Sequence, residues 1–225
     1  MPATANVPSR AAEDYLKAVY KLQRSESPVS TTALAGKLER SAASVTNMVK
    51  SLADQGLLEH VPYHGVSLTA AGELSALLII RRHRVIELYL IERLGYTWDT
   101  VHEEAERLEH AVSDELVDRM AAALGDPDFD PHGAPIPTSE GTISERPLQR
   151  LLDLQPGQAG VVRQVADNDS GRLLRLAKLG LRPGARVVRD EDATPGQPFP
   201  LNVEGEAVSL DPDLVEAVFV ERSDG

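Results

Sequence analysis

Two segments rich in histidine and glutamate, between residues 83 and 110, constrain the fold more than any other feature of the sequence. Each segment repeats these residues at the i, i+4 spacing that places side chains on one face of an α-helix. Such a face normally carries apolar side chains that pack into a core. The connection between the segments, GYTWD, is short enough to join two antiparallel helices, so the two polar faces can meet. We interpret this convergence as a divalent-metal site. Its candidate ligands are His83, Glu87, His102, Glu106, Glu109 and His110.

Two other interpretations of these segments have to be weighed. A histidine or glutamate on a helix is most often a solvated surface residue. The dipeptide His102-Glu103 also begins like the H-E-x-x-H motif of zinc proteases, but position 106 is glutamate, so that motif fails. The chain has no cysteine, and a metal must therefore be held by imidazole and oxygen, a ligand set that suits Mn²⁺, Fe²⁺, Co²⁺ or Zn²⁺.

Composition and charge predict the cellular location of the protein and the kind of partner it binds. No run of 18 apolar residues and no signal peptide is present, so we expect a soluble cytoplasmic protein that does not enter a membrane. A net charge of −12 ordinarily argues against nucleic acid as a partner. The first 70 residues, however, carry seven Lys or Arg and six Asp or Glu, so the acidic excess lies further along the chain.

The first 70 residues show the pattern of a winged helix-turn-helix. Serine residues precede three helical segments, at residues 10–24, 31–39 and 42–55, and serine is a favoured N-cap. Residues 57–69 then suggest two short strands around a glycine turn. This order of elements is typical of a DNA-binding module.

The third helix of this module has one apolar and one polar face. Val45, Met48, Val49 and Leu52 follow the helical repeat and are predicted to face the core. The opposite face carries small hydroxyl and amide side chains that suit contacts with DNA bases. We predict base contacts from Ser41, Ala43, Ser44 and Asn47, and phosphate contacts from Lys37, Arg40 and Lys50.

The rest of the chain divides into three further regions. Residues 71–125 are predicted to form helices, and residues 126–147 a proline-rich linker. Residues 148–225 are predicted to form short strands with one helical interval, which suggests a small barrel. His132, within the linker, is interpreted as a structural or solvated residue. The predicted fold is therefore mainly α with a small β domain. Its first domain, residues 1–70, is the winged helix-turn-helix.

Several of these motifs together resemble the diphtheria toxin repressor family of metal-dependent transcriptional regulators, in its manganese-responsive branch. The resemblance rests on AEDYLKAVYKL, SLTAAGE, RRHRVIELYL, VHEEAERLEH, SDELVDRM and DPHGAPIP, and covers nearly the whole chain. It implies a winged helix, a helical dimerisation and metal-binding domain, and a C-terminal SH3-like (FeoA-like) β-barrel.

The resemblance also implies two metal sites. The ancillary site falls on His83, Glu87 and His102, and the barrel adds the candidates Gln164 and Asp167. The primary, activating site falls on Asp14, Glu106, Glu109 and His110. Iron-responsive members have Met and Cys in place of Asp14 and Glu106, and the change from sulfur to carboxylate favours Mn²⁺, with Fe²⁺, Co²⁺ or Zn²⁺ as possible substitutes.

The expected function is that of a manganese-activated repressor of metal transport genes, with iron as the alternative activating ion. It would act as a homodimer on a palindromic operator in double-stranded DNA, without an organic cofactor and without enzymatic activity. One alternative is a metal-dependent hydrolase that uses the same His and Glu ligands. Another is a DNA-binding regulator that senses an organic ligand, with the His and Glu side chains merely solvated.

Overall fold

The computed structural model describes residues 9–61, 64–166, 169–190 and 198–223. The chain forms two compact units, which are described separately. Unit 1 contains residues Met1–Arg82 and Pro137–Ile143, and unit 2 contains His83–Ile136 and Ser144–Gly225. The long helix α4 (Ala70–Leu94) passes from the first unit into the second.

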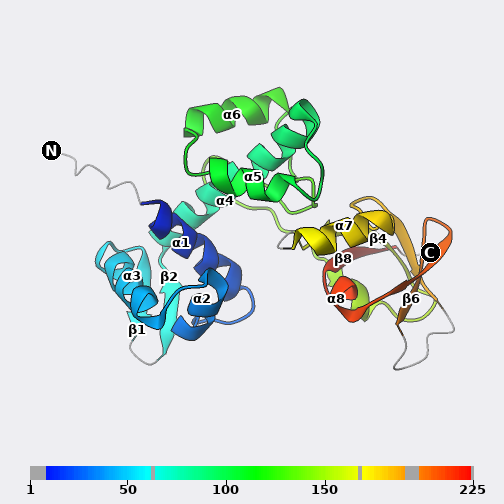
Figure 1. The fold of residues 1–225 in the computed structure, drawn as a ribbon, viewed down its shortest axis with the longest axis horizontal. Coiled ribbons are helices and arrows are strands. Elements are labelled where there is room, and N and C mark those ends of the chain that lie inside the picture. Colours follow the sequence, from blue (N-terminus) through cyan, green and yellow to red (C-terminus); the bar gives the residue numbers. More distant parts are fainter. Residues whose placement is uncertain (1–8, 62–63, 167–168, 191–197, 224–225) are drawn as a thin grey trace. The chain divides into compact units, whose positions relative to one another are not determined.

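Unit 1 is a winged helix-turn-helix (Figure 1). The hydroxyls of Ser9, Ser30 and Ser41 each accept a hydrogen bond from the first turn of a helix, as the sequence predicts. Two antiparallel strands form the wing, and the second bonds to Val29. The elements before α4 are α1 (Arg10–Gln23), α2 (Thr31–Leu38), α3 (Ala42–Asp54), β1 (Leu58–Val61) and β2 (Gly65–Leu68).

The core of unit 1 determines which face of α3 is exposed. Val45, Val49 and Leu52 are completely buried, and Met48 is partly buried against the same core. The predicted core face of α3 is therefore confirmed. The opposite face, which includes Ser44 and Asn47, stays exposed.

The helical part of unit 2 contains the end of α4, α5 (Val101–Leu108) and α6 (Asp114–Ala123). One prediction about α5 is wrong. We expected Glu109 and His110 to continue the helical stripe, but α5 ends at Leu108. Glu109 keeps right-handed helical dihedral angles as the C-cap, whereas His110 lies in the following turn. The sequence offers neither glycine nor proline at this point to mark the helix end.

The remainder of unit 2, which we call the β domain (residues 148–223), is a six-stranded antiparallel sheet with short helices. The strand order is β3-β8-β4-β5-β6-β7, and among the described residues the outer strands do not pair to close a barrel. Large apolar side chains such as Leu173, Leu176 and Val187 fill its core. The elements are β3 (Gln149–Arg150), η1 (Leu151–Asp153), β4 (Ala159–Val165), α7 (Ser170–Lys178), β5 (Arg186–Arg189), β6 (Phe199–Val203), β7 (Glu206–Leu210), α8 (Pro212–Val215) and β8 (Val218–Ser223).

The tetrapeptide Asp130–Gly133, which we call the DPHG segment, is a buried part of unit 2. Asp130 and His132 are 5% and 0% exposed. These two side chains are therefore as buried as core residues, although the surrounding stretch is rich in proline. Arg84 of α4 donates to the backbone carbonyl of Pro135 just beyond it. The predicted fold class, mainly α with a small SH3-like β domain, is confirmed. None of the described helices is long and apolar enough to span a membrane.

Candidate metal centre

Three predicted ligands meet in the helical part of unit 2. The atoms His83 Nε2, His102 Nδ1 and Glu87 Oε1 form a triangle with sides of 3.0, 3.0 and 3.1 Å. α4 supplies His83 and Glu87 one turn apart, and α5 supplies His102 from the facing helix. His83 is 2% exposed and Glu87 is fully buried, so these polar groups occupy positions that a core would otherwise give to apolar side chains.

The spacing of these three atoms fits a divalent metal. Ligand atoms in adjacent positions of an octahedron, each about 2.1 Å from a metal, lie about 3.0 Å apart. The triangle therefore has the dimensions of one octahedral face. The donor set of two imidazoles and one carboxylate also suits Mn²⁺, Fe²⁺ or Zn²⁺.

Glu109 orients one of the imidazoles. Its Oε2 atom lies 2.6 Å from Nδ1 of His83, a charge-assisted hydrogen bond in which the ring N–H donates. A metal at the triangle would bind Nε2 of His83 in its neutral form, and a histidine that binds metal usually donates its other N–H in this way. In this structure Glu109 acts as the partner of His83, and its other oxygen lies 3.3 Å from Nε2 of His110.

The electrostatics of the site keep Glu87 ionised. Burial alone raises the pKa of this carboxyl group, but the positive charge of His83 and the contacts of His102 and His132 outweigh it and hold the pKa well below its ordinary value. A buried carboxylate surrounded by imidazoles is ready to accept a cation, because no proton has to leave it.

A second cluster, which the sequence reasoning left out, lies on the other side of Glu87. It consists of Glu87, Asp130 and His132, all buried. Glu87 Oε2 has no hydrogen-bond partner in the described part of the chain, and Nδ1 of His132 lies 3.8 Å from it. His132 Nε2 lies 3.2 Å from the carbonyl oxygen of Trp98. If that nitrogen carries the proton, Nδ1 of the neutral ring is an acceptor that faces a carboxylate.

Asp130 has mainly a structural role in this cluster. Its Oδ1 atom accepts hydrogen bonds from the backbone N–H groups of His132 and Ala134, at 2.8 and 2.9 Å. Its Oδ2 atom lies 3.4 Å from Nε of Arg84. The carboxylate therefore shapes the loop that aims His132 at Glu87. The spacing of Asp130 and His132 in DPHG was the available sequence signal, but the surrounding prolines suggested a linker.

The other predicted ligands lie at different distances from these clusters. Glu106 Oε1 is 3.9 Å from both His83 Nδ1 and His102 Nε2, and its side chain is 40% exposed. Gln164 lies on β4, next to the residue that bonds to the backbone of His132. Asp14 belongs to α1 in unit 1, so its role beside Glu109 and His110 stays a prediction. Asp167 lies outside the described residues.

The predicted DNA-contacting residues are all exposed on unit 1. The hydroxyl of Ser41 caps α3, accepting from the N–H of Ser44 at 3.3 Å. Ser41 is thus held at the N-terminal end of the helix expected to enter the major groove. The exposed residues are Lys37, Arg40, Ser41, Ala43, Ser44, Asn47 and Lys50.

The fold and the buried cluster together define a DNA-binding protein with a metal centre, and comparison with known families agrees. Residues 9–66 match the N-terminal DNA-binding domain of iron-dependent repressors. Residues 69–138 match the metal-binding and dimerisation domain of the same repressors, and residues 149–222 match the FeoA domain. The chain belongs to the iron-dependent repressor family, and we conclude that it is a metal-dependent, DNA-binding transcriptional repressor.

Individual relatives extend over nearly the whole chain. The iron-dependent repressor IdeR of Mycobacterium tuberculosis is 31% identical over 223 residues, which cover 93% of this chain and 96% of IdeR. A solved manganese-dependent transcriptional repressor in complex with manganese is 36% identical, with a TM-score of 0.87 and coverage of 94% of this chain and 100% of that one. The structure of ScaR with bound Zn²⁺ is 31% identical, with a TM-score of 0.81 and coverage of 96% and 100%.

Proposed function

We propose that this repressor is activated by Mn²⁺. The observation that carries the proposal is the donor set, which consists of imidazoles and carboxylates in a chain without cysteine. Asp14 and Glu106, which the family resemblance assigns to the activating site, are carboxylates, and oxygen donors favour Mn²⁺ over softer ions. The manganese-dependent repressor named above supports this choice, whereas the similarity to IdeR leaves Fe²⁺ as the competing ion.

The activating residues come from both compact units. We propose that Asp14 of unit 1 binds the same ion as Glu106, Glu109 and His110 of unit 2, so that occupancy fixes the orientation of the winged helix. When bound, a divalent cation offsets the repulsion between nearby carboxylates, about 1 to 4 kcal/mol for each pair. The DNA-competent state is thereby selected, and a coupling of about 1 to 3 kcal/mol between metal and DNA is typical of such linkage.

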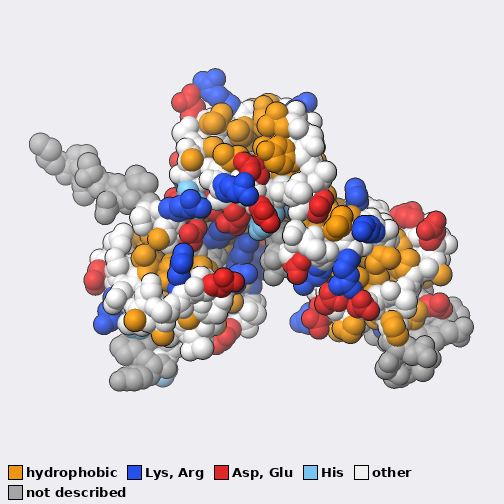
Figure 2. Space-filling view, in the orientation of Figure 1, with side chains coloured by type: hydrophobic (Ala, Val, Ile, Leu, Met, Phe, Trp, Pro, Cys, Tyr) orange, Lys and Arg blue, Asp and Glu red, His pale blue; other side chains and the backbone are white. Residues whose placement is uncertain are grey.

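We propose a homodimer as the DNA-binding species. One winged helix presents one recognition helix, and a two-fold dimer matches the symmetry of a palindromic operator. Figure 2 shows hydrophobic side chains gathered over the helical part of unit 2, where Leu116 of α6 is 42% exposed. An exposed apolar area of this kind suits the dimer interface. Genes for manganese or iron transport are the proposed targets.

The test is DNA binding measured by fluorescence anisotropy at fixed salt. A labelled DNA fragment from upstream of a metal-transporter gene is titrated with the protein in Mn²⁺, Fe²⁺, Zn²⁺ or chelator. We expect Mn²⁺ to increase the affinity about 5- to 150-fold over chelator. Asp14→Ala should remove this increase, whereas Glu103→Ala, at an exposed carboxylate on α5, should preserve it. Equal binding in Mn²⁺ and chelator would disprove the proposal.

A further inference from the structure

Trp98, the single tryptophan of the chain, lies between α4 and α5 and contacts the DPHG segment in three ways. Its indole Nε1 donates to the carbonyl oxygen of Pro131 at 3.0 Å. Its own carbonyl oxygen lies 3.2 Å from Nε2 of His132. Its ring also packs on the imidazole of His132, with centroids 5.1 Å apart and planes tilted by 36°. One residue therefore holds both the backbone and the side chain of this segment.

These contacts determine what His132 can do. A hydrogen bond from Nε2–H to the Trp98 carbonyl leaves Nδ1 on the side that faces Glu87, where the neutral ring would offer its lone pair to a cation. The indole restricts rotation of the imidazole from the adjacent face. His132 is thus held as a donor ligand by a group that does not itself belong to the cluster.

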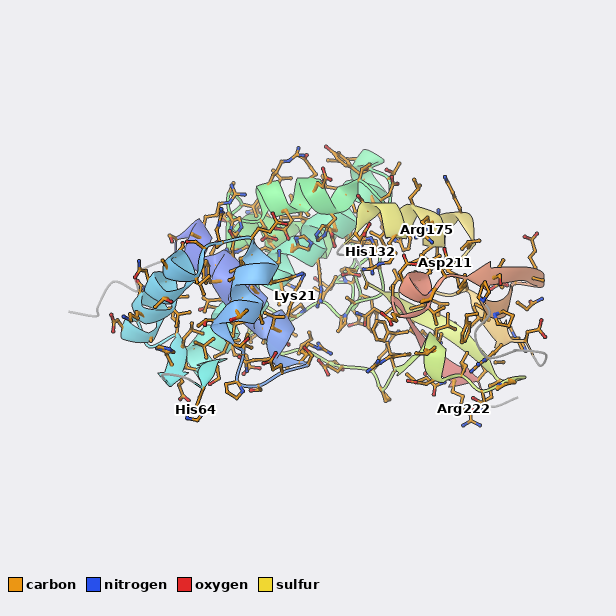
Figure 3. All side chains as sticks on the ribbon, turned by 60° about the horizontal axis from the view of Figure 1, so that its bottom comes forward. Lys21, His64, His132, Arg175, Asp211 and Arg222 are labelled. Carbon is orange, nitrogen blue, oxygen red and sulfur yellow. The ribbon has the colours of Figure 1, made fainter. Side chains whose placement is uncertain are left out.

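The same tryptophan packs against the hydrophobic core of the β domain. The guanidinium of Arg182, between α7 and β5, lies 5.6 Å from the centre of its ring. On the other side of the DPHG segment, the N–H of Val165 in β4 donates to the carbonyl oxygen of His132 at 2.9 Å. In Figure 3, His132 lies between the α4–α5 helices and the β domain, as these contacts require.

Gly133 permits this close approach. Its φ angle is +85°, and a Cβ atom at this position would lie 1.8 Å from the carbonyl oxygen of Arg163 in β4. Only glycine allows the segment to lie this close to the strand. The DPHG segment is consequently clamped between Trp98 and β4, with its histidine directed at Glu87.

We propose that Trp98 is a positioning residue that couples cation binding at Glu87 and His132 to docking of the β domain. This inference rests on the proposed function, because it assumes that a cation occupies the buried cluster. A cation held by His132 stabilises the DPHG segment, and the segment in turn stabilises β4 through Val165. Loss of the indole should break this sequence of contacts without removing any ligand.

The first measurement is intrinsic fluorescence of the metal-free full-length protein during titration with Zn²⁺, a diamagnetic ion, and with Mn²⁺. Because the chain has one tryptophan, all indole emission reports on this position. We expect a saturable change in emission in the wild type and in Asp14→Ala. His132→Gln should lose the change. An emission change that persists in His132→Gln would overturn the proposal.

The second measurement separates positioning from simple packing. Isothermal titration calorimetry with Mn²⁺ should show that Trp98→Ala weakens the His132-dependent binding step about 10- to 100-fold, as substitution of outer partners of a metal ligand typically does. Trp98→Phe keeps a ring but lacks the N–H, and should recover part of the affinity. Tyr96→Ala, which removes a ring that is 38% exposed in the same loop, is the matched control and should bind like the wild type.

Hydrogen–deuterium exchange tests the link to the β domain. Mn²⁺ should slow exchange at the Val165 amide in the wild type and in Tyr96→Ala, but not in Trp98→Ala. Exchange that responds equally in all three proteins overturns the proposal, as does a wild type in which Mn²⁺ changes neither emission nor exchange. The anisotropy experiment above is independent of these outcomes: Mn²⁺-dependent DNA binding with no response at Trp98 rejects this inference alone.

Discussion

At the scale of single residues, Glu87 links the two buried clusters. One carboxylate oxygen lies in the triangle with His83 and His102, and the other faces His132. The charge of His83 and the contacts of neighbouring imidazoles overcome the effect of burial and lower the pKa of Glu87. A fully buried carboxylate in this setting stabilises the metal-free fold only while it is ionised.

We therefore predict a pH-dependent effect of Glu87→Gln on the metal-free protein. The pKa of Glu87 in the folded state lies below the unfolded value of about 4.3, so its stabilisation is fully present above that pH and is lost as pH falls through the folded pKa. The variant should be less stable than the wild type by about 1 to 3 kcal/mol at pH 6. This difference in the free energy of unfolding should decrease toward pH 3. Urea unfolding at both pH values measures it, and a constant gap would contradict the assignment.

At the scale of secondary structure, the sequence predicts those features that are determined by residues close together in the chain. Serine caps and the apolar repeat of α3 depend on neighbouring residues, and both are correct. The contact of the α5 C-cap Glu109 with His83 and the burial of His132 beside Trp98 join residues distant in sequence. The i, i+4 spacing on two adjacent helices predicts that their polar faces meet, and the structure places His83, Glu87 and His102 within 3.1 Å of one another. Their role as metal ligands stays a prediction.

The exposed face of α3 leads to a prediction about specificity. Asn47 lies on this face, and a bidentate Asn–adenine contact contributes about 1 to 3 kcal/mol to base discrimination. Asn47→Ala should therefore weaken operator binding about 5- to 150-fold for each half-site of the dimer, while the affinity for unrelated DNA stays the same. Anisotropy with operator and scrambled duplexes in Mn²⁺ measures the two affinities. Equal weakening on both duplexes would show that Asn47 contacts phosphate instead of a base.

At the scale of the whole molecule, charge is distributed unevenly. The first 70 residues carry a net charge of +1, and the remaining residues carry −13, which gives the total of −12. Non-specific attraction to DNA should therefore be weak, and the few cations beside α3 must supply the phosphate contacts. We therefore expect operator affinity to depend more on the proposed metal-controlled orientation of the winged helix than on net charge.

The salt dependence of operator binding tests this distribution. Three phosphate contacts per protomer, from Lys37, Arg40 and Lys50, make six in a dimer and predict a slope of log K against log salt of about −5. Lys50→Ala removes two phosphate contacts from the dimer, so the slope should become shallower, at about −4. The affinity should decrease equally for all DNA sequences. Titrations at several salt concentrations in saturating Mn²⁺ provide both slopes. An unchanged slope in Lys50→Ala would place this lysine outside the DNA interface, whereas a wild-type slope much steeper than −5 would mean that cations outside α2 and α3 also contact phosphates.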